Sequence, residues 1–326
     1  MPFSNIAGND RIKSLLSRAV REGRIGQSLI FAGPEGIGKR RFATALAEAV
    51  NCERPLDGDA CGRCSQCLKI AAGEHLDVAT YNPDGQFIKI DKMREMSAEA
   101  QFKPFEGKRR ILIIDEADRL NVGAAHSILK ALEEPPESSL IILVTSRPYA
   151  LLDTIRSRCQ ILSFAPLSPA ELEAYLMANY KRPVEENGLI ARLAGGSVGK
   201  AIGIDIGEYL ARRAVIIKLV EAALVDRDAV HLLSAAEQLG RKLERDDFVS
   251  HMNALLLLLS DLFKLKLDQP LEMLTNADAA ERLRSIADSV DLASITDWTD
   301  KIERLLQDMT RNVNRQLALE AMVLSL

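Results

Sequence analysis

The sequence is poor in aromatic residues and has little excess of charge of either sign. Aromatic residues make up 5% of the 326 positions, with one tryptophan, and the formal net charge is −4. A surface built to bind nucleic acid would carry basic patches and stacking aromatic rings, so this composition argues against that class. The abundant leucine and alanine favour helix instead.

The chain also lacks a segment with the composition of a signal peptide or a membrane span. Residues 1–10 have no basic start followed by an apolar run. The most apolar stretch, residues 254–259, soon meets charged residues and falls short of the ~20 apolar residues that a span requires. We therefore expect a cytoplasmic protein without a membrane partner, in which residues 254–259 form a buried helix. In that reducing compartment cysteines bind metal or remain thiols.

A glycine-rich segment at residues 33–40 comes within one residue of the phosphate-loop pattern G-x-x-x-x-G-K-[ST]. Its small residues, Gly33, Gly36 and Gly38, let backbone N–H groups approach a phosphate, and Lys39 can reach terminal phosphates. The last position holds Arg40 instead of the hydroxyl that binds magnesium. Magnesium prefers oxygen ligands, so we expect nucleotide contacts here but no bound magnesium at Arg40.

The context of this loop separates it from a plain glycine turn. An apolar run at 28–32 precedes it and a helical pattern at 41–50 follows it. Further apolar runs and helical patterns alternate up to Pro166, which predicts a mostly parallel sheet covered by helices on both faces. The apolar runs lie at 111–114 and 139–145, and the helical patterns at 10–22, 91–101 and 122–133. Beyond Pro166 we expect helices only, the first capped by Ser168 with Glu171 three residues on.

Two carboxylates, Asp115 and Glu116, close the apolar run at 111–114. In phosphate-loop enzymes an aspartate at this point supports magnesium, and a neighbouring carboxylate can orient the attacking water. The alternative is a pair of solvated acids in a turn. Because a phosphate loop lies upstream, we interpret them as a Walker B-like pair, left vestigial by Arg40.

Four of the five cysteines lie within sixteen residues, at Cys52, Cys61, Cys64 and Cys67. Four thiolates suit tetrahedral zinc, and closed four-cysteine sites are usually structural. An iron–sulfur site is the rival, but the ferredoxin run continues with x3-C-P, which is absent here. Unliganded thiols are the other alternative. We predict structural zinc and interpret the nearby His75 as a surface histidine.

Three basic residues, Lys108, Arg109 and Arg110, stand before the apolar run at 111–114. Such a run could indicate DNA binding. Short basic runs more often form a solvated face, and we expect a solvated face here.

Taken together, the motifs resemble the bacterial DNA polymerase III clamp-loader subunits of the AAA+ class. The resemblance rests on LKALEEPP at 129–136, Ser157-Arg158-Cys159, the cysteine insert, and NVNRQLALE at 312–320. It implies an AAA+ P-loop domain at 1–166 with a zinc-binding insert at 51–75. A small helical lid domain at 167–205 and an all-α oligomerisation collar at 206–326 would follow.

The resemblance also implies a function. Motor subunits of the gamma/tau type end their loop in Lys-Thr or Lys-Ser and carry a lid arginine, whereas this chain has Arg40 and Gly199 at these places. It is therefore similar to a largely non-hydrolysing subunit, in whose own site ATP and magnesium are in doubt. In that family the arginine equivalent to Arg158 acts as an arginine finger on a neighbour's ATP. The implied partners are gamma/tau and delta subunits, with the sliding clamp and primer–template DNA reached through the complex.

Three alternatives remain open at this point. The chain could be an active ATPase of gamma/tau type, with water, Asp115 and Glu116 holding magnesium. It could be a zinc-dependent nucleic-acid-binding module with a vestigial nucleotide fold, although the charge and the few aromatics count against it. Arg158 could also pair with a local acid such as Asp153 instead of reaching a neighbour.

Overall fold

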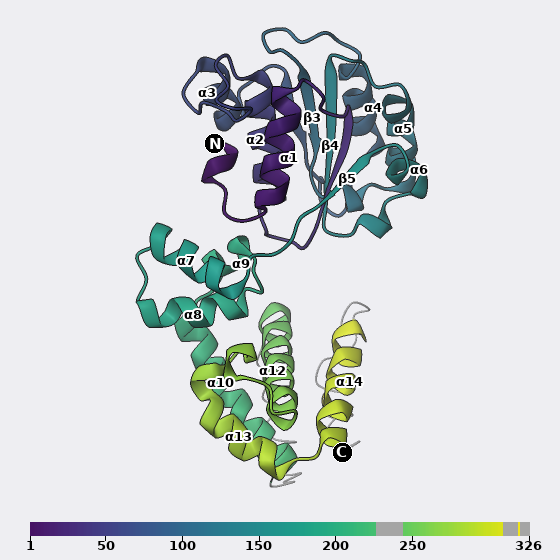
Figure 1. Ribbon diagram of the computed structural model, residues 1–326. Coiled ribbons are helices and arrows are strands. Elements are labelled where there is room, and N and C mark those ends of the chain that lie inside the picture. The colour runs from purple at the N-terminus through teal and green to yellow at the C-terminus, as the bar shows by residue number, and fades with distance from the viewer. Residues whose placement is uncertain (226–243, 309–318, 320–326) are drawn as a thin grey trace. The chain divides into compact units, whose positions relative to one another are not determined.

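The computed structural model describes residues 1–225, 244–308 and 319 (Figure 1). The chain forms two compact units. The first comprises Met1–Lys181 and Ala194–Gly203, and the second comprises Arg182–Leu193 and Ile204–Leu326. The division into three domains at 1–166, 167–205 and 206–326 stays a prediction. Of the motif at 312–320, only Leu319 lies within the described residues.

The first unit is built on a five-stranded parallel sheet. Its strands are β1 (Ser28–Ala32), β2 (Val78–Tyr81), β3 (Arg110–Ile114), β4 (Ser139–Thr145) and β5 (Gln160–Ser163). They follow the order β2-β3-β4-β1-β5, and every neighbouring pair is parallel. The mostly parallel sheet predicted from the alternating apolar runs is confirmed.

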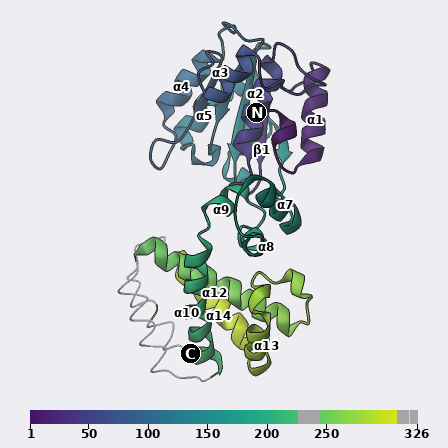
Figure 2. The ribbon, with the colours of Figure 1, turned by 90° about the vertical axis from the view of Figure 1, so that its left-hand side faces the viewer.

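Helices cover both faces of this sheet (Figure 1). Side chains of the inner strands β1, β3 and β4 alternate between the cores on the two sides. One face packs against α1 (Asp10–Arg21), α2 (Lys39–Asn51) and α3 (Ser65–Ala72). The other packs against α4 (Ile90–Glu99), α5 (Val122–Glu133) and α6 (Asp153–Arg156). Figure 2 shows α4 and α5 side by side. Within β1, for example, Phe31 belongs to the first core and Ile30 to the second.

Two further helices of the first unit follow the sheet. Helix α7 (Pro169–Asn179) begins at the predicted capping box, in which Ser168 Oγ accepts from Glu171 N and the Glu171 side chain accepts from Ser168 N. Helix α9 (Val198–Gly203) returns to the same unit. Leu167 N donates to Gly196 O at 3.1 Å and ties the approach of α9 to the start of α7.

The described residues of the second unit form helices and connecting loops, with no strand among them. Its helices are α8 (Val184–Leu193), α10 (Ile206–Val220), α12 (Arg245–Lys266), α13 (Ala280–Ser289) and α14 (Leu292–Asp308). Helix α12 contains the apolar stretch 254–259 and packs against α10, α13 and α14. By length and composition alone α12 could cross a membrane, but half of its apolar window is buried inside the unit. That burial is typical of a core helix, as the sequence predicted.

Candidate functional site

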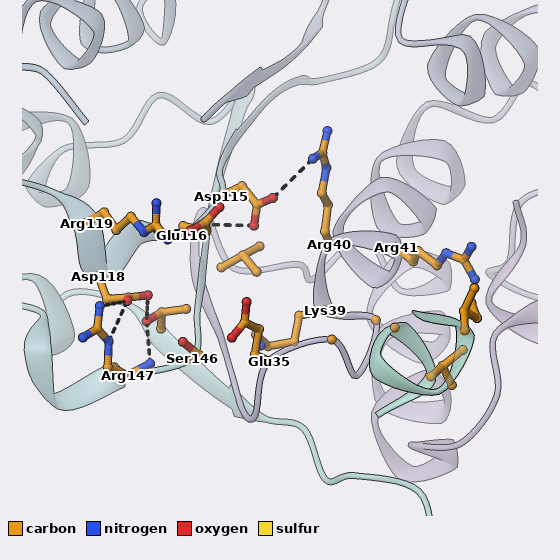
Figure 3. Close-up of a pocket in the computed structure, with 17 residues that line it drawn as sticks. Glu35, Lys39, Arg40, Arg41, Asp115, Glu116, Asp118, Arg119, Ser146 and Arg147 are labelled. Atoms are coloured by element: carbon orange, nitrogen blue, oxygen red, sulfur yellow. Dashed lines mark hydrogen bonds and ion pairs between the residues drawn. The ribbon is translucent and has the colours of Figure 1, made fainter. Parts of the chain in front are cut away.

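A cleft of about 570 Å3 opens at the carboxyl ends of strands β1, β3 and β4. These strands are neighbours in the sheet, and ligands of open α/β sheets bind at this edge. Four segments line the cleft: the glycine loop with the start of α2, residues 115–119, the end of β4 with residues 146 and 147, and α9. Figure 3 shows the charged side chains that these segments contribute. The cleft therefore unites the glycine loop with the acidic strand end predicted to face it.

The glycine loop needs its glycines for conformation and for space. Gly36 and Gly38 have φ of 74° and 94°, which favour a residue without a side chain. A Cβ at Gly36 would collide with Ser197 Oγ. The loop also receives a hydrogen bond from α9, since Gly199 N donates to Gly36 O at 2.9 Å. A Cβ at Gly199 would lie 3.1 Å from Gly36 O, so a side chain there would require the loop to shift by a few tenths of an ångström.

Lys39 is the first residue of α2 and is only 7% exposed. Its Nζ donates to Gly33 O at 2.7 Å and to Pro34 O at 2.6 Å, which wraps the side chain around the loop. Burial lowers the pKa of Lys39, although the carboxylates of Asp115 and Asp118 act in the opposite direction. The lysine is thus held inside the loop at the position that the motif predicts.

Arg40 makes an ion pair with the first carboxylate of the strand end. Its NH1 lies 3.4 Å from Asp115 Oδ2 (Figure 3). A guanidinium offers no oxygen ligand and stays charged at every relevant pH. Arg40 therefore occupies the carboxylate that would support magnesium, and the residues present do not fit a magnesium ion at this point.

The other acids of the strand end also have cationic partners. Glu116 has φ of 49° and pairs with Arg119 at 2.8 Å. Asp118 accepts from Thr145 Oγ1 at 2.8 Å and from Arg147 Nε at 2.9 Å. Burial alone would raise the pKa of Asp118, but these hydrogen bonds outweigh it and hold the pKa below its usual range. No sequence pattern indicates this role of Arg147, because its partner Asp118 lies 29 positions away.

Arg158 lies outside this cleft, just beyond α6. Its NH2 is 2.7 Å from Glu133 Oε1, and its NH1 donates to Thr154 O at 2.9 Å. Arg158 therefore does pair with an acid of its own chain, as the alternative from the sequence allowed, but this acid is Glu133 and not Asp153, which pairs with Arg156. The Glu133 contact joins the motif at 129–136 to the Ser-Arg-Cys motif. About a third of the Arg158 side chain, 34%, stays exposed.

The four predicted cysteines meet at one point between the end of α2 and the start of α3. The Sγ atoms of Cys52, Cys61, Cys64 and Cys67 all lie within 4.8 Å of one another and could hold a metal ion. Backbone N–H groups point at the sulfurs, with Cys61 N donating to Cys52 Sγ at 3.3 Å and Cys64 N to Cys61 Sγ at 3.4 Å. Backbone hydrogen bonding, chiefly from Arg63, lowers the pKa of Cys61 to about 6.

Two expectations about nearby residues were wrong. His75 is not a surface residue: it is 4% exposed, and its Nδ1 accepts from Asp77 N at 3.0 Å. The basic run forms a solvated face only at Lys108, which is exposed, and not at Arg109 and Arg110. Arg110 NH2 lies 3.0 Å from the Asp77 carboxylate, and Arg109 NH2 donates to Ser139 O at 3.0 Å. These arginines join segments of the fold to one another.

The parallel sheet, the glycine loop after β1 and the carboxylates after β3 define a phosphate-loop α/β protein. Two family profiles identify the family within this class. One, described as DNA polymerase III, delta subunit, matches residues 8–168, and its C-terminal counterpart matches residues 208–326. Together they match most of the chain, which therefore belongs to the DNA polymerase III delta-subunit family.

Individual relatives agree with this family. The chain is 29% identical to DNA polymerase III subunit delta' of Bacillus subtilis over 97% of its own length and 95% of the relative. It is 36% identical to the delta' subunit of Pseudomonas aeruginosa over 51% of each chain. It is also 30% identical to the tau subunit of B. subtilis, where the match covers 68% of this chain but 40% of that protein.

Proposed function

We propose that this chain is a delta-prime-type clamp-loader subunit of DNA polymerase III that does not itself turn over ATP. In the cytoplasm it would assemble with gamma/tau and delta subunits and help to load the sliding clamp onto primed DNA. The near full-length similarity to the delta' subunit of B. subtilis supports this assignment. Under the same proposal, residues 167–205 serve as a lid and residues 206–326 as an oligomerisation collar.

The observation that carries the proposal is the ion pair between Arg40 and Asp115, 3.4 Å apart. An active ATPase of gamma/tau type would need Asp115 to support magnesium. Here the permanently charged Arg40 pairs with that carboxylate and also replaces the Ser or Thr of the phosphate-loop pattern. A Cβ at Gly199 would also lie 3.1 Å from Gly36 O, a close contact that disfavours a lid arginine at position 199. Both features favour the subunit without turnover.

The catalytic contribution would come from Arg158, acting on ATP bound by a neighbour. An arginine finger stabilises the transition state most effectively when its guanidinium is already oriented before the reaction, because preorganised charge needs no rearrangement. The contacts with Glu133 and the Thr154 carbonyl fix the direction of the Arg158 side chain. About a third of that side chain is exposed, so a partner subunit could still contact the guanidinium. The absence of Arg158 from the lining of the chain's own cleft suits action on a second chain.

The cysteine cluster is proposed to hold a structural zinc ion. Tetrahedral Zn–S bonds of ≈ 2.3 Å place sulfur atoms about 3.8 Å apart. Cys52 Sγ and Cys64 Sγ are 3.9 Å apart. N–H groups directed at the sulfurs stabilise thiolates, which are the form that binds metal. The ion would join the end of α2 to α3 within the first unit.

Replacing the finger tests the proposed function. We expect Arg158→Ala to leave assembly with gamma/tau and delta intact but to lower the clamp-dependent ATPase and the clamp-loading rate. The ATP site of the neighbouring subunit would lose the Arg158 guanidinium, and an arginine finger typically raises the rate about 10³-fold or more. Both rates would be measured with the reconstituted complex on primed DNA.

Arg156→Ala is the matched control, because Arg156 lies two residues away and is engaged with Asp153 and the ring of Tyr149. It should leave both rates near wild type. A normal ATPase and normal loading with an assembled Arg158→Ala complex would contradict the proposed role.

A further inference from the structure

We infer that a second pocket, at the opposite edge of the sheet from the phosphate-loop cleft, binds a small organic anion with an apolar body, such as an aliphatic or aryl carboxylate. The pocket has a volume of about 230 Å3 and lies within the first unit. Its cations are Lys108 and Arg109, the first two residues of the basic run. This inference goes beyond the proposed function and depends neither on Arg158 nor on the phosphate loop.

The pocket lies where strands β1 and β3 begin. Helices α1 and α2 lie side by side and both end at this edge of the sheet (Figure 1). The ends of these helices, the turn before β1 and the segment after α2 supply apolar walls: Val20, Ile25, Ala49, Val50 and Pro55. An apolar group placed between these walls would be removed from water, which favours binding.

The two cations of this pocket form no ion pair with a carboxylate of the described residues. Arg109 donates only to backbone carbonyl groups, at 3.0–3.5 Å, and its buried Nε has no hydrogen-bond partner among those residues. Burial alone lowers the pKa of Arg109. Lys108 Nζ likewise donates to the carbonyl oxygen of Cys52. The next residue, Arg110, pairs instead with Asp77. A partly buried guanidinium without a counter-charge is costly, so an anion in this pocket would be stabilised.

Asn51 fixes the backbone of both cations before a ligand arrives. This last residue of α2 is 1% exposed. Its Oδ1 accepts from Lys108 N at 2.8 Å and from Arg109 N at 2.9 Å, and its Nδ2 donates to Arg109 O at 3.0 Å. Gly107 leaves space for this side chain, since a Cβ there would lie 3.0 Å from Asn51 Oδ1. Cations held in this way lose little conformational entropy when an anion binds.

The size and the lining of the pocket select the class of ligand. About 230 Å3 is less than the ≈ 300–1,000 Å3 that is usual for sites of drug-sized ligands, so a short apolar body fits. Inorganic phosphate would leave the apolar walls unused, and a neutral hydrocarbon would leave the two cations unpaired. A carboxylate suits them, because guanidinium and ammonium groups form strong charge-assisted hydrogen bonds with carboxylate oxygens.

An NMR titration of the full-length chain, labelled at its valine and isoleucine methyl groups, tests the inference. The probe is 4-phenylbutyrate, with its uncharged amide and acetate as matched ligands that lack the charge or the apolar body. We expect 4-phenylbutyrate to cause saturable shifts of the methyl signals of Val20, Ile25 and Val50. The amide and acetate should bind about tenfold more weakly or worse. Added salt should weaken the binding of 4-phenylbutyrate.

Two variants test the residues while leaving the core intact. Lys108→Ala removes one cation, and Pro55→Glu places a carboxylate at the wall of the pocket. Both residues are exposed, so the methyl spectrum of each variant should remain that of a folded chain. Each substitution should weaken the binding of 4-phenylbutyrate by about tenfold, because a charged hydrogen bond is lost or a like charge is added.

Lys103→Ala is the matched control, since Lys103 is an exposed lysine of the same loop before β3 and does not line the pocket. It should bind like wild type. The inference is overturned if 4-phenylbutyrate gives no saturable shifts, if it shifts only methyl signals away from the pocket, or if the amide binds as tightly. Equal affinities of the Lys108→Ala and Lys103→Ala variants would also overturn it. None of these results bears on the Arg158 experiment, so the two proposals fail separately.

Discussion

Asp77 is a fully buried carboxylate that four donors surround. It accepts from the backbone N–H groups of residues 105, 106 and 107 at 2.7–2.8 Å, and Arg110 NH2 lies at 3.0 Å. Burial alone would raise the pKa of Asp77, but these hydrogen bonds outweigh it and keep the pKa below its usual range. One residue thus joins the start of β2, the loop before β3 and the first residue of β3.

The first prediction concerns this carboxylate. Asp77→Asn should lower the free energy of unfolding at neutral pH by about 3 kcal/mol, because it leaves a mostly buried guanidinium without its counter-charge. Since the folded pKa is depressed, the charge stabilises the protein above the unfolded value of about 4, and this contribution is lost as pH falls through the folded pKa. Urea unfolding at several pH values would measure both effects. The variant should lose less stability than wild type on acidification.

Asp57→Asn is the control, because Asp57 is an exposed aspartate paired with Arg21. Exposed pairs contribute about 0–1 kcal/mol. If Asp77→Asn costs no more than Asp57→Asn, or keeps the wild-type response to acid, the assigned role of Asp77 is wrong.

The same residues show what sequence could not predict at this scale. The glycine loop was predictable because its functional groups are contiguous and one pattern contains them. Asp77 and Arg110 are 33 positions apart. Nothing in the run Lys108-Arg109-Arg110 indicates that its last residue faces a buried acid. Likewise Arg158 gained its Glu133 partner from a segment 25 positions upstream only once the chain folded.

Among the elements, burial decided which strands could be predicted. Strands β1 and β4 lie inside the sheet and are buried at every position, so each appears as an unbroken apolar run with clear bounds. Strands β2 and β5 form the edges, have four residues each and are largely accessible, so no run or alternation marks them. Helix α3 was also not predicted from the sequence. It has only eight residues, and its one cysteine was interpreted as part of the metal-binding spacing rather than as part of a helix.

The cysteine cluster gives the prediction that belongs to this scale. Metal analysis of the purified chain should find about one zinc ion bound by four thiolates. Cys64→Ser should reduce the zinc content and lower the Tm of the chain, by about 2–4 °C for each kcal/mol lost. The reason is that the ion joins α2 to α3, and metal binding to the folded chain adds to its stability.

Cys159→Ser serves as the control, since Cys159 lies outside the cluster and burial raises its pKa to about 12. It should keep the full zinc content. Iron with a visible charge-transfer band, or a chain without metal whose Tm does not respond to Cys64→Ser, would contradict a structural zinc site.

At the scale of the whole molecule, the chain combines a phosphate-loop unit with a helical unit. The change from alternating strands and helices to helices alone was visible in the sequence, because Pro166 and the capping box at Ser168 mark it. In contrast, the sequence did not show which unit each helix belongs to. Helix α8 belongs to the second unit although α7 and α9, on either side of it in the sequence, belong to the first. The place of α8 depends on long-range packing, because Leu189 belongs to the hydrophobic core of the second unit.

The last prediction concerns catalysis by the complete chain. We expect the isolated protein to hydrolyse ATP at background rate, because Asp115 is paired with Arg40 and no arginine of residues 167–205 lines the cleft. Arg40→Thr should not restore full activity, and adding Gly199→Arg should not help, since a side chain at 199 would press against Gly36 O. Steady-state phosphate release measures this, with Glu116→Gln as the control for contaminating ATPase. Robust wild-type turnover that Glu116→Gln abolishes would establish an active ATPase and refute the subunit without turnover.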